Sequence, residues 1–145
     1  MGTEQPPEPR GLGLFEAWGV EIEYMLVRSD TLDVFPAADR VLEIAAGSPA
    51  GDVERGRIAW SNELVLHVIE LKTNGPAEAI EGLAPRFQES VDEIGRILAP
   101  LGGRLLSTAA HPWMDPLAES RIWPHEYSAV YEAFDRIFGC RGHGW

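Results

Sequence analysis

A predicted strand with two glutamates on one face constrains this chain more than any other stretch. Residues 19–27 read GVEIEYMLV, and because side chains alternate along a strand, Glu21 and Glu23 share a face. Their Cα atoms would lie about 7 Å apart, within reach of one hard cation or of two neighbouring cations. Without a cation the carboxylates repel each other, so the alternative is an edge strand whose acidic face lies in water.

The length and composition are those of a single globular domain with a hydrophobic core. The chain has 145 residues, of which 45% are hydrophobic and 24% are charged. It contains no apolar run long enough to span a bilayer, and residues 1–10 are polar and proline-rich, so we expect a cytoplasmic protein without a membrane span or signal peptide. The single cysteine, Cys140, is interpreted as a reduced structural thiol.

The acidic charge restricts the class of partner. The net charge is −11, from 23 acidic and 12 basic residues, and Lys72 is the only lysine. Such a surface argues against nucleic acid, which is bound through basic patches. It does not exclude ATP, because magnesium ions can link acidic side chains to phosphate oxygens.

Hydrophobic periodicity predicts one α+β domain over residues 14–145, after a disordered leader over residues 1–13. A short strand is expected at residues 104–108, and helices are expected at 37–46, 80–98 and 124–138. Pro85 lies inside the second helix and should kink or split it. The apolar stripe predicted for the third helix consists of Tyr127, Val130, Tyr131, Phe134 and Ile137.

A second acidic strand is predicted from Asn62 onward, within the β-rich segment 57–73, RIAWSNELVLHVIELKT. Both of its faces are largely apolar, which is typical of a central strand covered on each side. Glu63 and Glu70 are separated by an odd number of positions, so a regular strand points them to opposite faces. If both serve one site, a bulge or a bend must intervene.

Glutamates dominate the groups that could carry chemistry. Four of them on two predicted strands, with no second cysteine, favour magnesium or manganese over structural zinc. The chain has no P-loop, no GxSxG elbow and no HExxH pair, which excludes several common enzyme classes. The remaining polar candidates are His67, His111, Arg121, His125, Arg141 and His143.

Four blocks of sequence resemble the amino-terminal part of the glutamate-cysteine ligase family, in particular its bacterial carboxylate-amine ligase branch. In order along the chain they are GVEIEY, SNELVLHVIELKTNGP, HPWMDP and YEAFDRIFGCRGHGW. The resemblance extends from about Phe15 to the end of the chain. It implies a glutamine synthetase-like fold, in which a curved antiparallel sheet forms a funnel with helices packed outside.

The resemblance also implies a reaction. Members of the family use ATP and Mg²⁺, with Mn²⁺ as a possible substitute, to phosphorylate a carboxylate of glutamate or a similar substrate. An amine then displaces phosphate from the acyl phosphate and forms an amide. Carried over to this chain, the resemblance assigns the metal cofactor to Glu21, Glu23, Glu63 and Glu70, and the substrate to His111, Arg141 and His143.

Residues 14–145 would then be the amino-terminal portion of a longer catalytic domain, with weak or absent ligase activity by itself. An incomplete sheet would expose an edge, which favours a homodimer. The alternative is a truncated, non-catalytic relative that binds a small molecule or dimerises, with its glutamates solvated.

Overall fold

The computed structural model describes residues 11–108 and 110–142. They form an α+β fold around an open antiparallel sheet of five strands in the order β2-β3-β4-β1-β5, which confirms the predicted fold class. The strands are β1 (Glu21–Arg28), β2 (Asp52–Arg55), β3 (Ile58–Asn62), β4 (Val68–Thr73) and β5 (Gly103–Leu106). Apart from residues 11–13, the predicted leader lies outside the described residues.

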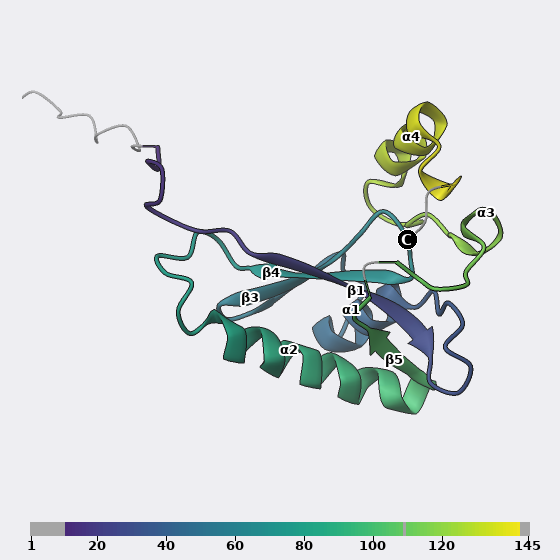
Figure 1. The fold of residues 1–145 in the computed structure, drawn as a ribbon, viewed down its shortest axis with the longest axis horizontal. Coiled ribbons are helices and arrows are strands. Elements are labelled where there is room, and N and C mark those ends of the chain that lie inside the picture. Colours follow the sequence, from purple (N-terminus) through teal and green to yellow (C-terminus); the bar gives the residue numbers. More distant parts are fainter. Residues whose placement is uncertain (1–10, 109, 143–145) are drawn as a thin grey trace, which may run out of the picture.

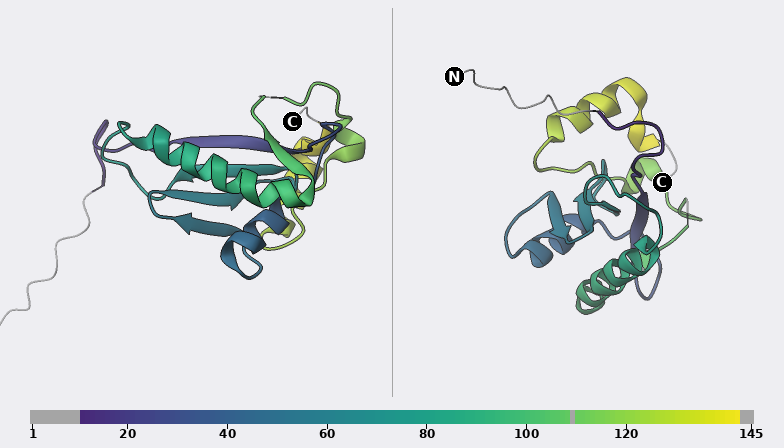
Figure 2. Two further views of the ribbon diagram at one scale, coloured as in Figure 1. Left: turned by 90° about the horizontal axis from the view of Figure 1, so that it is seen from below. Right: turned by 90° about the vertical axis from the view of Figure 1, so that its left-hand side faces the viewer.

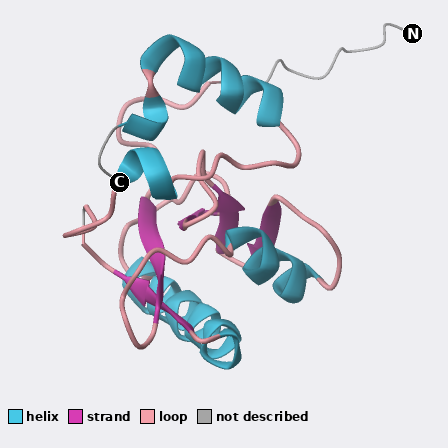
Figure 3. Ribbon diagram, turned by 90° about the vertical axis from the view of Figure 1, so that its right-hand side faces the viewer, coloured by secondary structure: helices cyan, strands magenta, loops and turns pink. Residues whose placement is uncertain are grey.

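Helices lie on both sides of the sheet. They are α1 (Ala38–Ala46), α2 (Leu83–Leu98), α3 (Pro116–Glu119) and α4 (Ser128–Phe138), with 3₁₀ turns η1 (Ala99–Leu101) and η2 (Cys140–Gly142). Figure 1 shows α2 below the sheet and α4 above it, and Figure 3 shows the strands between these helices. Within the described residues, no helix combines the length and the apolar character that crossing a bilayer requires.

The main core lies between the sheet and the helices α1 and α2, and the left-hand view of Figure 2, seen from below, shows these helices against the strands. Alternate residues of β1 and β4 point into it, including the fully buried Leu26, Ile69 and Leu71. Val41 and Leu42 of α1 pack into the same cluster. Because side chains alternate, Glu23 and Glu70 are directed to the opposite face of the sheet.

The β-rich segment 57–73, in which one strand was predicted from Asn62, is a hairpin instead. β3 ends at Asn62, the chain reverses, and β4 begins at Val68 and pairs antiparallel with β3. The expectation of a central strand holds for β4, which lies between β3 and β1. The single-strand prediction was wrong because the reversal, ELVLH, contains no glycine or proline to mark a turn.

Distant partners stabilise this apolar reversal. The carbonyl of Leu64 accepts a hydrogen bond from the N–H of Trp123 at 2.9 Å, and the N–H of Leu66 donates to the carbonyl of Arg121 at 2.8 Å. Val65 is fully buried. Together with a local hydrogen bond from the Val68 N–H to the Val65 carbonyl at 3.2 Å, these contacts satisfy backbone groups of a turn that has no glycine or proline.

Helix α2 is continuous, so the predicted kink at Pro85 was wrong. The helix begins at Leu83, not Ile80, after Gly82 in a left-handed conformation with φ 78°. Pro85 therefore lies in the first turn, where a backbone N–H has no acceptor within the helix. The missing N–H of proline costs no helical hydrogen bond there.

Helix α4 has the predicted apolar pattern but buries none of its residues. The exposed fraction is 43% for Phe134 and 70% for Ile137. Tyr131 is half-buried, and its hydroxyl accepts a hydrogen bond from the Asn62 side chain at 3.0 Å. The helix begins at Ser128, four residues after the predicted start.

Candidate metal centre

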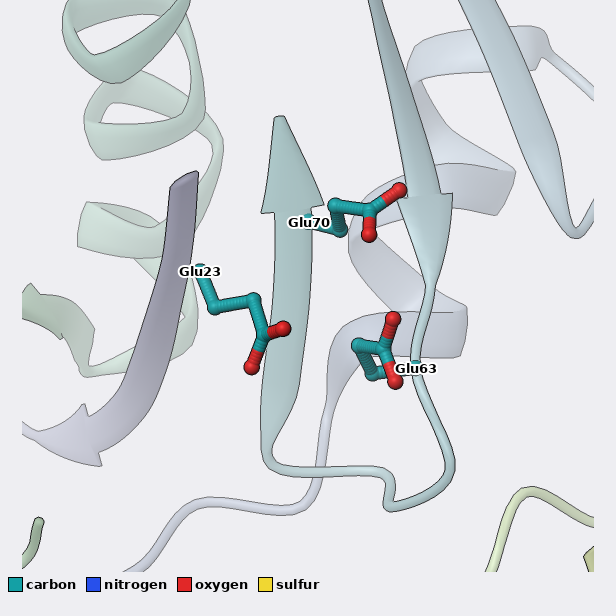
Figure 4. Close-up of side chains that lie close together, drawn as sticks. All are labelled: Glu23, Glu63 and Glu70. Carbon is teal, nitrogen blue, oxygen red and sulfur yellow. The ribbon is translucent and has the colours of Figure 1, made fainter. Parts of the chain in front are cut away.

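Three carboxylates converge on the face of the sheet opposite α2. Glu23 comes from β1, Glu70 comes from β4, and Glu63 follows the last residue of β3. One oxygen of each lies within 4.8 Å of the others. Figure 4 shows the three side chains directed toward a common space above β4.

Strand register explains this convergence. Glu23 and Glu70 are direct cross-strand partners in the β1–β4 pair. Glu63 joins them because the chain reverses directly after it, which supplies the bend that the odd spacing requires. Like charges placed opposite one another destabilise a sheet unless something neutralises them. One ammonium, that of Lys72, lies beside Glu70, so three crowded carboxylates still leave an excess of negative charge that suits a bound cation.

The electrostatics of the cluster reflect this crowding. Burial raises the pKa of Glu63 to about 7, with further contributions from the charges of Glu23 and Glu70 and opposition from a hydrogen bond donated by the Leu64 N–H. The pKa of Glu23 is also raised, first by burial and then by the charges of Glu70 and Glu21. In the absence of a cation, the cluster therefore tends to retain a proton near neutral pH.

A basic group that was not predicted as a site residue lies beside the cluster. The ammonium of Lys72 is 3.0 Å from Glu70 Oε1 and 3.6 Å from Asp52 Oδ2. It donates to the hydroxyl of Ser61 at 2.8 Å, and that hydroxyl donates to Glu70 at 2.9 Å. Burial lowers the pKa of Lys72, but hydrogen bonding to Glu70 and the charges of Glu70 and Asp52 raise it overall.

The period of the strand could have identified Lys72 in advance, because it follows Glu70 by two residues and so shares its face. Glu21 shares that face as well and is the cross-strand partner of Lys72. It is exposed and is not one of the three residues whose oxygens converge. Its role as a metal ligand stays a prediction.

The predicted substrate residues lie outside the carboxylate cluster. His111 is buried, its Nδ1 accepts from the Met114 N–H at 3.2 Å, and its Nε2 is 2.8 Å from the carbonyl of Leu32. Because Nδ1 accepts, the proton belongs on Nε2, which donates to Leu32. Both ring nitrogens are thus engaged by the backbone.

Arg141 lies in η2, where its guanidinium pairs with Asp135 at 2.7 Å. His143 lies outside the described residues. The substrate roles of His111, Arg141 and His143 stay predictions.

Comparison with known proteins identifies the family. Residues 17–142 match the glutamate-cysteine ligase family 2, GCS2. The chain belongs to this family. The GCS2 chain is also 31% identical over 127 residues to an uncharacterised protein of Archaeoglobus fulgidus.

That alignment covers 88% of the GCS2 chain and 34% of the archaeal protein, so the chain spans about a third of its relative's length. Membership of GCS2 implies descent shared with carboxylate-amine ligases, which generally use ATP and Mg²⁺. The donor set fits that cation, because three carboxylates supply the anionic oxygen ligands that hard divalent ions prefer.

Proposed function

We propose that this GCS2 chain holds the divalent cation of an ATP-dependent carboxylate-amine ligase, with Glu23, Glu63 and Glu70 as its ligands. The observation that carries the proposal is the convergence of these oxygens within 4.8 Å on one face of the sheet. Mg²⁺ is the expected ion, and Mn²⁺ accepts the same oxygen donors. The reaction would join an amine to a carboxylate of glutamate or a similar substrate through an acyl phosphate.

When bound, the cation would neutralise charge on the transferring phosphoryl group and help to align it. The chain's own residues fix the ligands in place. Glu23 and Glu70 project from paired central strands, which move little relative to each other. Ser61 and Lys72 both contact the Glu70 carboxylate, at 2.9 and 3.0 Å, which restricts its rotamer.

Mn²⁺ binding to the full chain, followed by the electron paramagnetic resonance signal of free Mn²⁺, tests the ligand assignment. We expect Glu70→Gln to weaken binding by about tenfold or more, since ligand and supporting residues of metal sites have effects of at least that size. Glu78→Gln removes an exposed carboxylate outside the cluster and is the matched control. Equal affinity in the wild type and in Glu70→Gln would refute the assignment.

Nucleotide binding tests the ligase part of the proposal. ATP with Mg²⁺ should raise the melting temperature of the chain, because a ligand that binds only the folded state stabilises it. The rise should disappear in Glu23→Gln. If the glutamates are merely solvated, as in a non-catalytic module, ATP with Mg²⁺ should leave both melting temperatures unchanged.

A further inference from the structure

The face of the sheet that carries the candidate metal centre is acidic across four strands. One row of cross-strand partners runs from β2 through β3 and β4 to β1, and it consists of Asp52, Ser61, Glu70 and Glu23. Residues directly opposite one another share a face, and Glu63 joins the same group of carboxylates. Because Mg²⁺ is usually held by one or two carboxylates together with water and phosphate oxygens, this face has enough carboxylates for two ions.

The ammonium of Lys72 lies among these acidic groups. It is 3.0 Å from Oε1 of Glu70 and 3.6 Å from Oδ2 of Asp52, and it donates to the hydroxyl of Ser61 at 2.8 Å. These three oxygen-bearing side chains come from three different strands. The cross-strand partner of Lys72 in β1 is a further carboxylate, Glu21. The ammonium is therefore surrounded by oxygens in the way that a bound cation would be.

Glu70 belongs both to the carboxylate cluster and to the surroundings of Lys72. It contributes an oxygen to the cluster with Glu23 and Glu63, and its Oε1 pairs with the ammonium. In two-metal sites the ions lie about 4 Å apart. A second divalent ion at that distance from the first would have to share Glu70 with the ammonium, which would repel it.

We propose that the Lys72 ammonium takes the place of a second divalent cation beside Glu70, so that this face of the sheet binds one divalent ion and not a pair. The inference rests on the proposed ligands Glu23, Glu63 and Glu70, and it adds the number of ions that they hold. Lys72 is then a positioning residue, because it acts on the ion through Glu70.

The hydrogen bonds around Ser61 hold the ammonium in this place. Ser61 is buried, and its hydroxyl accepts from Lys72 while it donates to Glu70 at 2.9 Å. The side chain of Lys72 is only 33% exposed, so it is not free in solvent. The alternative is that Lys72 turns into water when metal arrives and leaves room for a second ion.

The number of Mn²⁺ ions bound per chain tests the inference, and it is obtained from the electron paramagnetic resonance signal of free Mn²⁺ at saturation. Lys72→Gln removes the ammonium, whereas Lys72→Arg keeps a positive charge at the same position. Arg40→Gln removes the same charge from an exposed position of α1, on the other side of the sheet, and is the matched control.

We expect one bound Mn²⁺ in the wild type, in Lys72→Arg and in Arg40→Gln, and two in Lys72→Gln. Combining Lys72→Gln with Asp52→Asn should restore the number to one, because Asp52 would be a ligand of the second ion. A purely structural role of Lys72 would change the melting temperature and leave the number of ions at one in every variant.

A second measurement needs no variant and therefore does not depend on how Lys72→Gln folds. Because Lys72 is the only lysine, labelling with ¹⁵N-lysine gives a single side-chain ammonium resonance. An ammonium held in hydrogen bonds exchanges its protons with water more slowly than a solvated one. We expect this resonance to be present without metal and to remain at saturating Mg²⁺.

Four results would overturn the inference. They are two Mn²⁺ ions in the wild type, one in folded Lys72→Gln, two in Arg40→Gln, and loss of the ammonium resonance when Mg²⁺ is added. Each of them leaves the proposed ligands standing, since the wild type still binds the metal. Absence of Mn²⁺ binding by the wild type would instead refute the ligand assignment, and this inference with it.

Discussion

Helices α2 and α4 share an amphipathic pattern but differ in what covers them. Five residues of α2 are buried, including Phe87, Ile94 and Leu98, whereas α4 buries none. On α4, Ile137 is 70% exposed and Phe138 is 64% exposed. The amphipathic pattern of a sequence therefore determines which face a helix can bury, but not whether another segment of these residues packs against that face.

The largest expected difference between the two helices comes from the same substitution in each. Ile94→Ala in α2 empties a fully buried position and should lower the free energy of unfolding by about 2–5 kcal/mol. Ile137→Ala in α4 removes an exposed side chain and should change it by no more than about 0.5 kcal/mol. Urea denaturation measures both, and similar losses would show that the α4 stripe is buried in solution.

Substituting one glycine in each region should give an intermediate effect on stability and so extends the comparison. A Cβ on Gly103 would lie 2.7 Å from the Phe35 ring, so Gly103→Ala should cost about 1–3 kcal/mol of stability through overpacking. A Cβ on Gly142, in η2, would meet Leu117 at 3.5 Å, an ordinary contact, and Gly142→Ala should be neutral. A melting temperature that falls equally in both variants would contradict the close approach of Gly103 to the Phe35 ring.

The last comparison concerns the pH dependence of stability, which has opposite signs in the two regions. The pKa of Glu63 is raised to about 7, so between about pH 4.5 and 7 the folded chain keeps a proton that the unfolded chain releases. Stability in EDTA should therefore fall across this range, and Glu63→Gln should remove that part of the fall. The pKa of Asp135 is lowered by its hydrogen bonds with Arg141, so its contribution is lost only as pH falls below 3.8.

The buried His67 also titrates in this pH range, so the experiment must compare the stability of Glu63→Gln with that of the wild type at each pH. Burial lowers the pKa of His67 to about 4. Between about pH 4 and 6.5 this histidine is therefore protonated only in the unfolded chain, so its contribution makes stability rise with pH, opposite to that of Glu63. Melting temperatures of the wild type and Glu63→Gln are therefore subtracted at each pH. A difference that does not change from pH 5 to 7.5 would contradict the raised pKa, and Asp135→Asn should leave this range unaffected.

The sequence predicted most of the fold because its local signals agree with its packing. The strand around Glu21 and Glu23, the first helix and the short strand predicted at residues 104–108 all have counterparts in the structure, as β1, α1 and β5. The hairpin was missed because its turn is apolar and is held by Leu64 and Leu66 through distant segments. Such partners lie about 55 residues away and leave no local pattern.

The site could be predicted only in part, because it also depends on contacts between segments that are distant in the sequence. Period two puts Glu21 and Glu23 on one face, but only the register of β1 and β4 shows that Glu23, rather than Glu21, lies opposite Glu70. The bend that Glu63 requires was inferred from an odd spacing, whereas its form, a full reversal, depends on tertiary contacts. The exposure of α4 could not be predicted, since an apolar stripe looks the same with or without a cover.

Anomalous X-ray diffraction from crystals of the chain grown with Mn²⁺ tests the central claim most directly. The account predicts an anomalous peak between β1 and β4, within coordination distance of carboxylate oxygens from Glu23, Glu63 and Glu70. Well-ordered carboxylates without such a peak at saturating Mn²⁺, or side chains that point apart into solvent, would contradict it.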